Sequence, residues 1–291
     1  MIFDIKLHIA YEYANPAVGG RHLVCVMPLA QGAGQTVQRA TLQVEPAPQE
    51  RLDRLDFFGN AVTEFSFRGP HDSVVLTMQA RVTRTAVSAP VAESIMLAEV
   101  SAELALCRDV GPNAPLHFLS PSLRVPRDAA MTAFARAQLR PGMSVAKAVV
   151  AVGRAIHRQM RFDATATTVD TPAPEAFAKR RGVCQDFAHI MIACLRGVGI
   201  PAGYVSGYLR TLPPPGKPRL EGADAMHAWV RVRCGAAAGW VEFDPTNDCF
   251  AGGDHIVVAR GRDYSDVAPI KGTLRIAGSQ QSRQAVDVIP V

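Results

Sequence analysis

The sequence predicts an α+β protein in which an antiparallel β-sandwich-like domain precedes a core of helices and sheet. In the first part of the chain, apolar and polar residues alternate in short segments separated by glycine-containing turns, as in antiparallel sandwiches. Further along, apolar residues recur at helical spacing, and strand-like segments then return. The 291 residues are enough for about two domains. We place these domains at 1–115 and 116–291, the second including C-terminal strands.

The first strand shows the alternation most clearly. Between Phe3 and Tyr13 the apolar residues occupy every odd position, which predicts one buried face and one face toward water. Gly19-Gly20, Gly59-Asn60 and Gly69-Pro70 provide turn signals. Further strands are predicted at 22–29, 39–44, 61–67 and 74–82.

Helices begin the second part. Residues 127–139 read as a helix, and Ser144 is placed to cap the next one, which extends to about residue 160. A short helix follows the prolines at 172 and 174. The next helix opens at Cys184 and ends near Gly197; its apolar stripe is buried, and we expect His189, which lies off that stripe, on the surface or at an interface.

Strands return after this helix. They are predicted at 203–209, 227–233 and 240–244, with a proline-rich loop over 212–225. The tail alternates again at 255–260, 273–277 and 285–291.

Composition excludes several function classes. The net charge of +5 is small, and the densest cationic group is the three-residue run Lys179–Arg181, so we expect no nucleic-acid partner. No apolar run approaches the roughly 18 residues of a membrane span. The N-terminus lacks the order of a signal peptide, so we expect a cytoplasmic protein without a membrane partner. The six cysteines contain no C-x-x-C pair; we expect reduced thiols and neither a metal nor a cofactor.

The candidate chemistry lies in three short segments, at 182–187, 226–229 and 243–246. A thiol nucleophile needs a base to remove its proton and a third group to orient that base. Cys184 is predicted at a helix start, where free N–H groups and the positive end of the dipole favour a thiolate. Gly182 leaves room for a substrate backbone.

A hairpin would bring the other two groups together. If 227–233 pairs with 240–244 so that His227 is opposite Asp244, the two side chains share a face. This register also sets Trp229 opposite Glu242. One ring nitrogen of His227 then meets Asp244, and the other faces Cys184.

These residues resemble the transglutaminase-like superfamily, in particular bacterial proteins described as cysteine proteases. Residues 182–209, 227–230 and 240–247 are similar to that family's three motifs, in the right order. The tail at 255–264 and the strand-rich N-terminal region also look like this bacterial subgroup. The resemblance implies a papain-like α+β core in which the Cys helix packs on an antiparallel sheet.

By position, the resemblance implies that Cys184 is the nucleophile, His227 the general base and then acid, and Asp244 the orienting group. Animal transglutaminases are thought to use a Trp upstream of the Cys as an oxyanion donor, whereas both tryptophans here, at 229 and 240, lie downstream. The backbone N–H of Cys184 can supply one donor. Gln185 and the loop at 165–170 are candidates for the second.

Other residues near these motifs have two interpretations each. Asp186 is a candidate substrate contact or a cap of the first helical turn. Trp229 and Tyr208 are candidates to line the substrate cleft, or they pack in the core. Cys194 falls on the buried stripe, and the remaining cysteines are expected to be inert.

We therefore expect a thiol enzyme that acts on amide bonds of a protein or peptide substrate through a thioester, most simply a cysteine protease or amidase. One alternative is a protein-glutamine transglutaminase, in which an amine intercepts the thioester. The other is a non-catalytic peptide-binding module, whose signature would be a missing triad residue.

Overall fold

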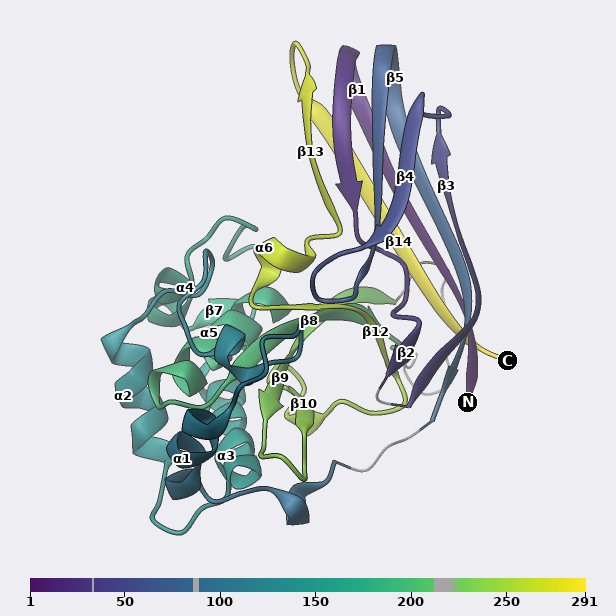
Figure 1. The fold of residues 1–291 in the computed structure, drawn as a ribbon. Helices are drawn as coiled ribbons and strands as arrows, with labels where there is room; N and C mark the ends of the chain where they lie inside the picture. The colour runs from purple at the N-terminus through teal and green to yellow at the C-terminus, as the bar shows by residue number, and fades with distance from the viewer. Residues whose placement is uncertain (33, 86–88, 212–221, 223) are drawn as a thin grey trace, which may run out of the picture.

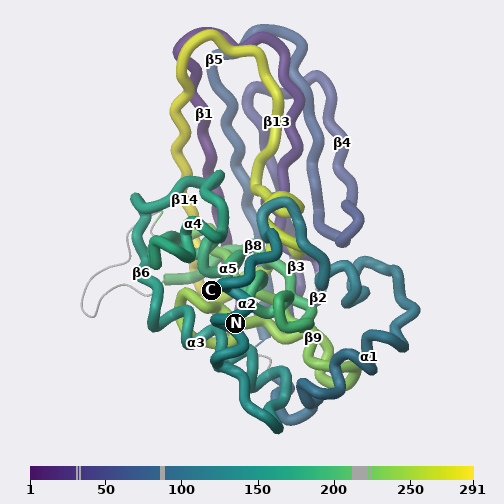
Figure 2. The backbone as a smooth tube through the Cα atoms, turned by 90° about the vertical axis from the view of Figure 1, so that its left-hand side faces the viewer, coloured from purple at the N-terminus to yellow at the C-terminus, as the bar shows by residue number. Residues whose placement is uncertain are grey.

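The structure, a computed structural model, describes the whole chain except residues 33, 86–88, 212–221 and 223. A long β domain rises from a compact core of helices and sheet (Figure 1), and a view turned by 90° shows the same two parts (Figure 2). The α+β class and the strand-rich N-terminal region are confirmed. The predicted loop at 212–225 lies largely outside the described residues.

The β domain is a seven-stranded sheet built on two long central strands. These are β1 (Ile2–Val24) and β5 (Ala61–Arg84), which pair with each other in antiparallel fashion along most of their length. The remaining strands are β2 (Gln31–Gly32), β3 (Gln35–Glu45), β4 (Glu50–Leu55), β13 (Ile270–Arg275) and β14 (Gln280–Pro290).

Each long strand replaces two strands that we predicted as separate. The glycine signal at Gly19-Gly20 marks a bulge in β1, where the register with β5 shifts and Gly19 has φ of 67°. Gly69-Pro70 is likewise inside β5. A bulge inserts an extra residue and bends a strand without ending it, so local turn chemistry mimics a strand boundary. The predicted buried face of β1 is correct: Phe3, for example, is fully buried.

The last two tail strands, β13 and β14, belong to this sheet and not to the core, where we placed them. Strand β14 pairs with the first half of β1, and β13 pairs with its second half. Both chain termini consequently lie near one another (Figure 1). Alternation predicts that a segment is a strand, but the choice of partner is non-local and is made by tertiary packing.

The segment between the two domains is also more helical than predicted. Helix α1 (Val100–Leu106) lies in the range that we assigned to the β domain. Short 3-10 turns flank it at Val91–Glu93, Leu97–Glu99 and Pro115–Phe118.

The core is a five-stranded antiparallel sheet with helices on one face. The strand order is β11-β10-β9-β8-β12. The bounds are β8 (Ala202–Leu209), β9 (Ala225–Arg233), β10 (Trp240–Asp244), β11 (Cys249–Phe250) and β12 (His255–Gly261). The helices are α2 (Ala129–Gln138), α3 (Val145–Gln159), α4 (Ala173–Lys179), α5 (Cys184–Gly197) and α6 (Tyr264–Val267). A two-stranded parallel pair joins β6 (Arg161–Phe162) to β7 (Arg181–Gly182).

Helix α5 is the central helix of the core. It contacts β8 and β9 on one side and α2, α3 and α4 on the others. Its residues from Gln185 to Arg196 are all buried, including His189, which is 2% exposed. The prediction of a surface His189 is therefore wrong: neighbours surround the helix on all sides, so even residues off the apolar stripe are covered. Nε2 of His189 accepts a hydrogen bond from the Tyr264 N–H.

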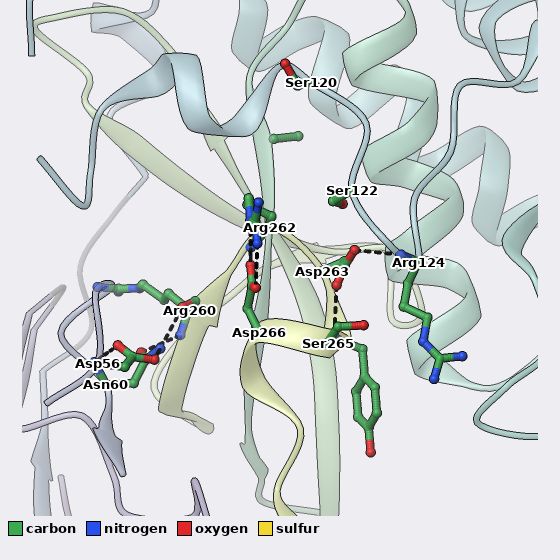
Figure 3. A network of polar contacts seen from close by, with 12 residues as sticks. Asp56, Asn60, Ser120, Ser122, Arg124, Arg260, Arg262, Asp263, Ser265 and Asp266 are labelled. Atoms are coloured by element: carbon green, nitrogen blue, oxygen red, sulfur yellow. Dashed lines mark hydrogen bonds and ion pairs between the residues drawn. The ribbon is translucent and has the colours of Figure 1, made fainter. Parts of the chain in front are cut away.

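Side-chain amides of the β domain bind the backbone of the edge strand β12. Gln35 donates to the Val257 carbonyl and accepts from the Val257 N–H, each at 2.8 Å. Asn60 forms the same two-way pair with Arg260, also at 2.8 Å, and is itself held by Asp56 (Figure 3). An edge strand presents unpaired backbone groups. The β domain thus satisfies and fixes this edge of the core sheet.

No helix among the residues that the structure describes is both long and apolar enough to cross a membrane.

Candidate active site

Cys184 lies at the first position of α5, as predicted, and is half-buried. Asp186 caps this helix start: Oδ2 accepts hydrogen bonds from the Val183 N–H at 2.8 Å and from the Thr167 hydroxyl at 2.7 Å. Burial raises the pKa of Asp186, and these two hydrogen bonds oppose the rise. Of the two interpretations of Asp186, the structure supports the cap, because its carboxylate is 1% exposed and engaged.

Gly182 makes room for this cap. A Cβ atom at position 182 would lie 2.4 Å from Oδ2 of Asp186. Gly182, two residues before Cys184, is thus required by the capping carboxylate, and the substrate clearance that we expected of it stays a prediction.

His227 and Asp244 meet across the β9–β10 hairpin, where Nε2 of His227 lies 2.7 Å from Oδ2 of Asp244. The predicted register is wrong by two residues. Glu242 pairs with Arg231, which places Asp244 in line with Trp229 and diagonal to His227. A shift of two preserves the face of a strand, and diagonal neighbours remain within reach of long side chains. The contact therefore forms despite the shifted register.

The Asp244 carboxylate is fully buried and accepts five hydrogen bonds. Oδ2 accepts from His227, from Nδ2 of Asn247 at 2.7 Å and from Nε2 of His255 at 3.1 Å. Oδ1 accepts from the N–H groups of Thr246, at 2.9 Å, and Asn247, at 3.2 Å. Burial raises the pKa of Asp244, but the hydrogen bonds, first those of His227 and His255, outweigh it and hold the pKa well below its ordinary value. Asp244 is therefore ionised.

His227 is polarised between Asp244 and Cys184. Burial lowers the pKa of His227, but hydrogen bonds with Asp244 and then with Cys184 outweigh it and raise the value to about 10. Because Nε2 is bonded to Asp244, Nδ1 is the ring nitrogen left for the thiol. The structure thus brings together the three residues that the sequence singled out.

Sequence reasoning did not assign His255 and Asn247 to the site. Asn247 directly follows Asp-Pro-Thr, and its backbone and side-chain amides both donate to Asp244. His255 opens β12; its Nδ1 accepts from the Gly252 N–H at 3.2 Å, so Nε2 carries the ring proton donated to Asp244. The proximity of Asn247 in the sequence could have indicated its role. No local pattern indicates that of His255.

His227, Asp244 and His255 together could hold a metal ion, since their ligand atoms lie within 4.8 Å of one another. Hydrogen bonds account for the cluster without one. The Nε2 that would ligate a metal on His255 carries a proton, and both oxygens of Asp244 already accept hydrogen bonds. We therefore interpret the three residues as a hydrogen-bonded network in which the two histidines stabilise the negative charge of Asp244.

Gln185 holds a loop beside the helix start. Its Nε2 donates to the Val169 carbonyl at 3.1 Å, and Arg124 donates to the same carbonyl at 3.2 Å and to Asp170 at 2.7 Å. Since an amide nitrogen has two N–H groups, Gln185 remains a candidate for the second oxyanion donor.

Of the two interpretations of Trp229 and Tyr208, the structure supports packing in the core, because both side chains are buried. The Trp229 indole is fully buried, donates to Glu242 at 2.8 Å and covers Gly207, where an added Cβ would lie 2.3 Å from the ring. The Tyr208 hydroxyl, also buried, donates to the Val26 carbonyl at 2.6 Å. Strand alternation identifies the face of a side chain, but not whether a second layer covers that face.

The other thiols differ from Cys184 in their surroundings. All six cysteines are free. Burial raises the pKa of Cys25 and Cys234 to about 12, and Cys194 is buried in the core as predicted. Burial also raises the pKa of Cys249 to about 11.

Two family models match the chain. Residues 132–245 match the transglutaminase-like superfamily, and residues 3–83 match the bacterial transglutaminase-like N-terminal region. The first match contains all three residues of the candidate triad.

Similar proteins span nearly the whole length. An uncharacterized protein of Mycobacterium tuberculosis is 35% identical over 86% of this chain and 80% of its own. One of Mycobacterium leprae is 31% identical over 96% and 95%. A crystal structure from Cytophaga hutchinsonii, described as "a Putative Cysteine Protease", is 22% identical with a TM-score of 0.75, covers 99% of this chain and 90% of its own, and shows the same fold. The chain therefore belongs to the transglutaminase-like superfamily and carries that superfamily's bacterial N-terminal region.

Proposed function

We propose that this protein is a thiol enzyme that cleaves amide bonds, with Cys184 as nucleophile, His227 as general base and acid, and Asp244 as the group that orients His227. The observation that carries the proposal is the position of His227, which is bonded through Nε2 to an ionised, buried Asp244 and interacts with the thiol at the start of α5. Family membership supports a thiol enzyme in general.

The electrostatics favour an activated thiol. A His227 with a pKa of about 10 retains its proton at neutral pH, which stabilises a thiolate beside it. The positive end of the α5 dipole, where Cys184 lies, acts in the same direction. The resting state that we propose is a thiolate–imidazolium pair.

The reaction then proceeds in two halves. The Cys184 sulfur attacks the amide carbonyl, and the backbone N–H of Cys184 is one donor to the developing oxyanion. His227 gives its proton to the leaving amine as the C–N bond breaks, which leaves a thioester. His227 next removes a proton from water, the resulting hydroxide attacks the thioester, and the acid product and the resting pair are regenerated.

Water is the second nucleophile in this proposal, which makes the enzyme a protease or amidase acting on a protein or peptide. An amine attacking the same thioester would give a transglutaminase.

We also propose that the protein works in a reducing compartment such as the cytoplasm, because all six of its thiols are free.

The test is turnover of a peptide library by the wild type and Cys184→Ala, read by mass spectrometry with and without added primary amine. We expect new carboxyl ends from the wild type and none from Cys184→Ala. Cys107→Ala, which removes another half-buried thiol, is the control and should retain activity. Equal turnover by Cys184→Ala would refute the proposal, and amine-linked products in place of acids would establish the transferase.

A further inference from the structure

We propose that His255 is a positioning residue for the candidate triad. It holds the Asp244 carboxylate in the orientation in which Oδ2 accepts the hydrogen bond from His227. The inference rests on the proposed function and adds a fourth side chain to it. His255 acts through Asp244, to which its ring donates a hydrogen bond.

The first observation is that both histidines donate to the same atom. Nε2 of His227 lies 2.7 Å from Oδ2 of Asp244, and Nε2 of His255 lies 3.1 Å from it. The two imidazole rings have centroids 6.2 Å apart and are tilted by 51° to each other. Rotation of the carboxylate away from His227 would therefore break the His255 hydrogen bond as well.

The second observation fixes the tautomer of His255. The Gly252 N–H points at Nδ1, at 3.2 Å, so Nδ1 must be the acceptor and Nε2 must carry the proton. In this form the ring is a neutral donor, and it stabilises the charge on Asp244 without adding a charge of its own.

The third observation is that the place of His255 is itself fixed. The ring is 5% exposed, and the edge of the Trp229 indole packs on it at 5.1 Å between centroids. Trp229 is anchored by Glu242, which in turn accepts from Arg260 at 2.7 Å. Two residues beyond His255, Val257 is held by Gln35 of the β domain.

The chemical consequence concerns where the proton resides. A carboxylate oxygen that accepts several hydrogen bonds is a weaker base than one that accepts a single bond. The donation from His255 therefore keeps the mobile proton on His227 instead of Asp244, where it would be unavailable to the leaving amine. Loss of this donor should lower kcat and leave KM nearly unchanged.

The experiment compares His255→Gln with His255→Met, a pair matched in length. Glutamine can place its amide N–H where Nε2 lies, whereas methionine has no N–H to donate. We expect His255→Met to lower kcat about 10- to 100-fold, with KM within about twofold of wild type. His255→Gln should recover most of that loss. His22→Leu, which removes a similarly buried histidine in the β domain, should not change kcat.

A second measurement needs no substrate. It is the rate at which iodoacetamide alkylates Cys184, followed by peptide mapping as the pH is varied. In the wild type and in His255→Gln we expect this rate to remain high down to low pH. In His255→Met we expect the profile to shift toward that of an ordinary thiol, near a pKa of about 8.5.

Each outcome distinguishes the two proposals. If wild-type Cys184 alkylates like an ordinary thiol and no amide is cleaved, the proposed function fails. If the wild type is activated but folded His255→Met matches it in both assays, the role of His255 is overturned and the triad stands. Should the variants not fold, NMR of 15N-labelled histidine in the wild type remains decisive: His255 protonated on Nδ1 would refute the inference.

Discussion

Nε2 of His255 lies 3.1 Å from Oδ2 of Asp244, although two strands, β9 and β8, lie between the strands of these residues in the core sheet. Asp244 ends β10 and His255 begins β12. The ten residues between them cross this end of the sheet, so the contact depends on the path of the connection as well as on strand pairing.

The candidate base gives the first prediction. His227→Asn should lower kcat/KM on the order of 10²- to 10⁴-fold, which is the usual contribution of general acid–base catalysis. Steady-state kinetics on a responsive peptide measures this loss. His8→Asn replaces an exposed histidine on β1 of the β domain and should have no effect on kcat/KM. A loss of kcat/KM in His227→Asn no larger than that in His8→Asn would contradict the assignment.

The raised pKa of His227 predicts a pH dependence of stability. This pKa is about 10 in the folded protein and about 6.5 in the unfolded chain, so protonated His227 stabilises the fold fully below pH 6.5. That contribution is lost as the pH rises through 10. The difference in Tm between the wild type and His227→Gln should therefore shrink from pH 6.5 to pH 10, as thermal unfolding can measure. A difference that grows over this range would contradict the prediction.

The hydrogen bonds of Gln35 and Asn60 with the β12 backbone predict that the β domain stabilises the core. Asn60→Ala leaves the N–H and carbonyl of Arg260 without this partner in a partly buried place, and we expect it to lower the free energy of unfolding by about 1–3 kcal/mol. Urea unfolding provides the measurement. Asn15→Ala removes an exposed amide that donates to the Ala277 carbonyl, and should change stability by less than about 0.5 kcal/mol. Equal effects of the two variants would mean that the hydrogen bonds of Asn60 are dispensable.

The glycine before the thiol gives a fourth prediction. In Gly182→Ala the new Cβ displaces the Asp186 carboxylate from Val183, so we expect a loss of about 1–3 kcal/mol of stability and slower alkylation of Cys184. Gly69→Ala is the matched control, because no atom lies within 4 Å of its added Cβ. A Gly182→Ala variant as stable and as reactive as the wild type would show that the cap can move without cost.

Much of the site was predictable because its parts are local. A helix start at Cys184, a strand that begins near His227 and a strand that ends at Asp244 follow from spacing and capping chemistry that act within a few residues. The hairpin register was wrong by two, yet the predicted His–Asp contact survived, since an even shift keeps both side chains on one face.

The parts that could not be predicted depend on contacts between distant segments. Trp229 and Tyr208 have the alternation of cleft residues, but a second layer covers them. His189 lies off an apolar stripe, but neighbours surround its helix. Alternation likewise indicated the tail strands β13 and β14 without indicating that β1 would be their partner.

The sequence by itself thus determined the α+β class, the helix that opens at Cys184 and the three residues of the candidate triad. Only the tertiary structure decided that His255 and Asn247 join them on Asp244, and that the β domain holds the edge strand β12 on which His255 lies. The physical reason is the separation along the sequence over which each kind of interaction acts. Propensity, periodicity and capping act over a few residues, whereas burial and strand pairing join residues as far apart in the chain as Phe3 and Pro290.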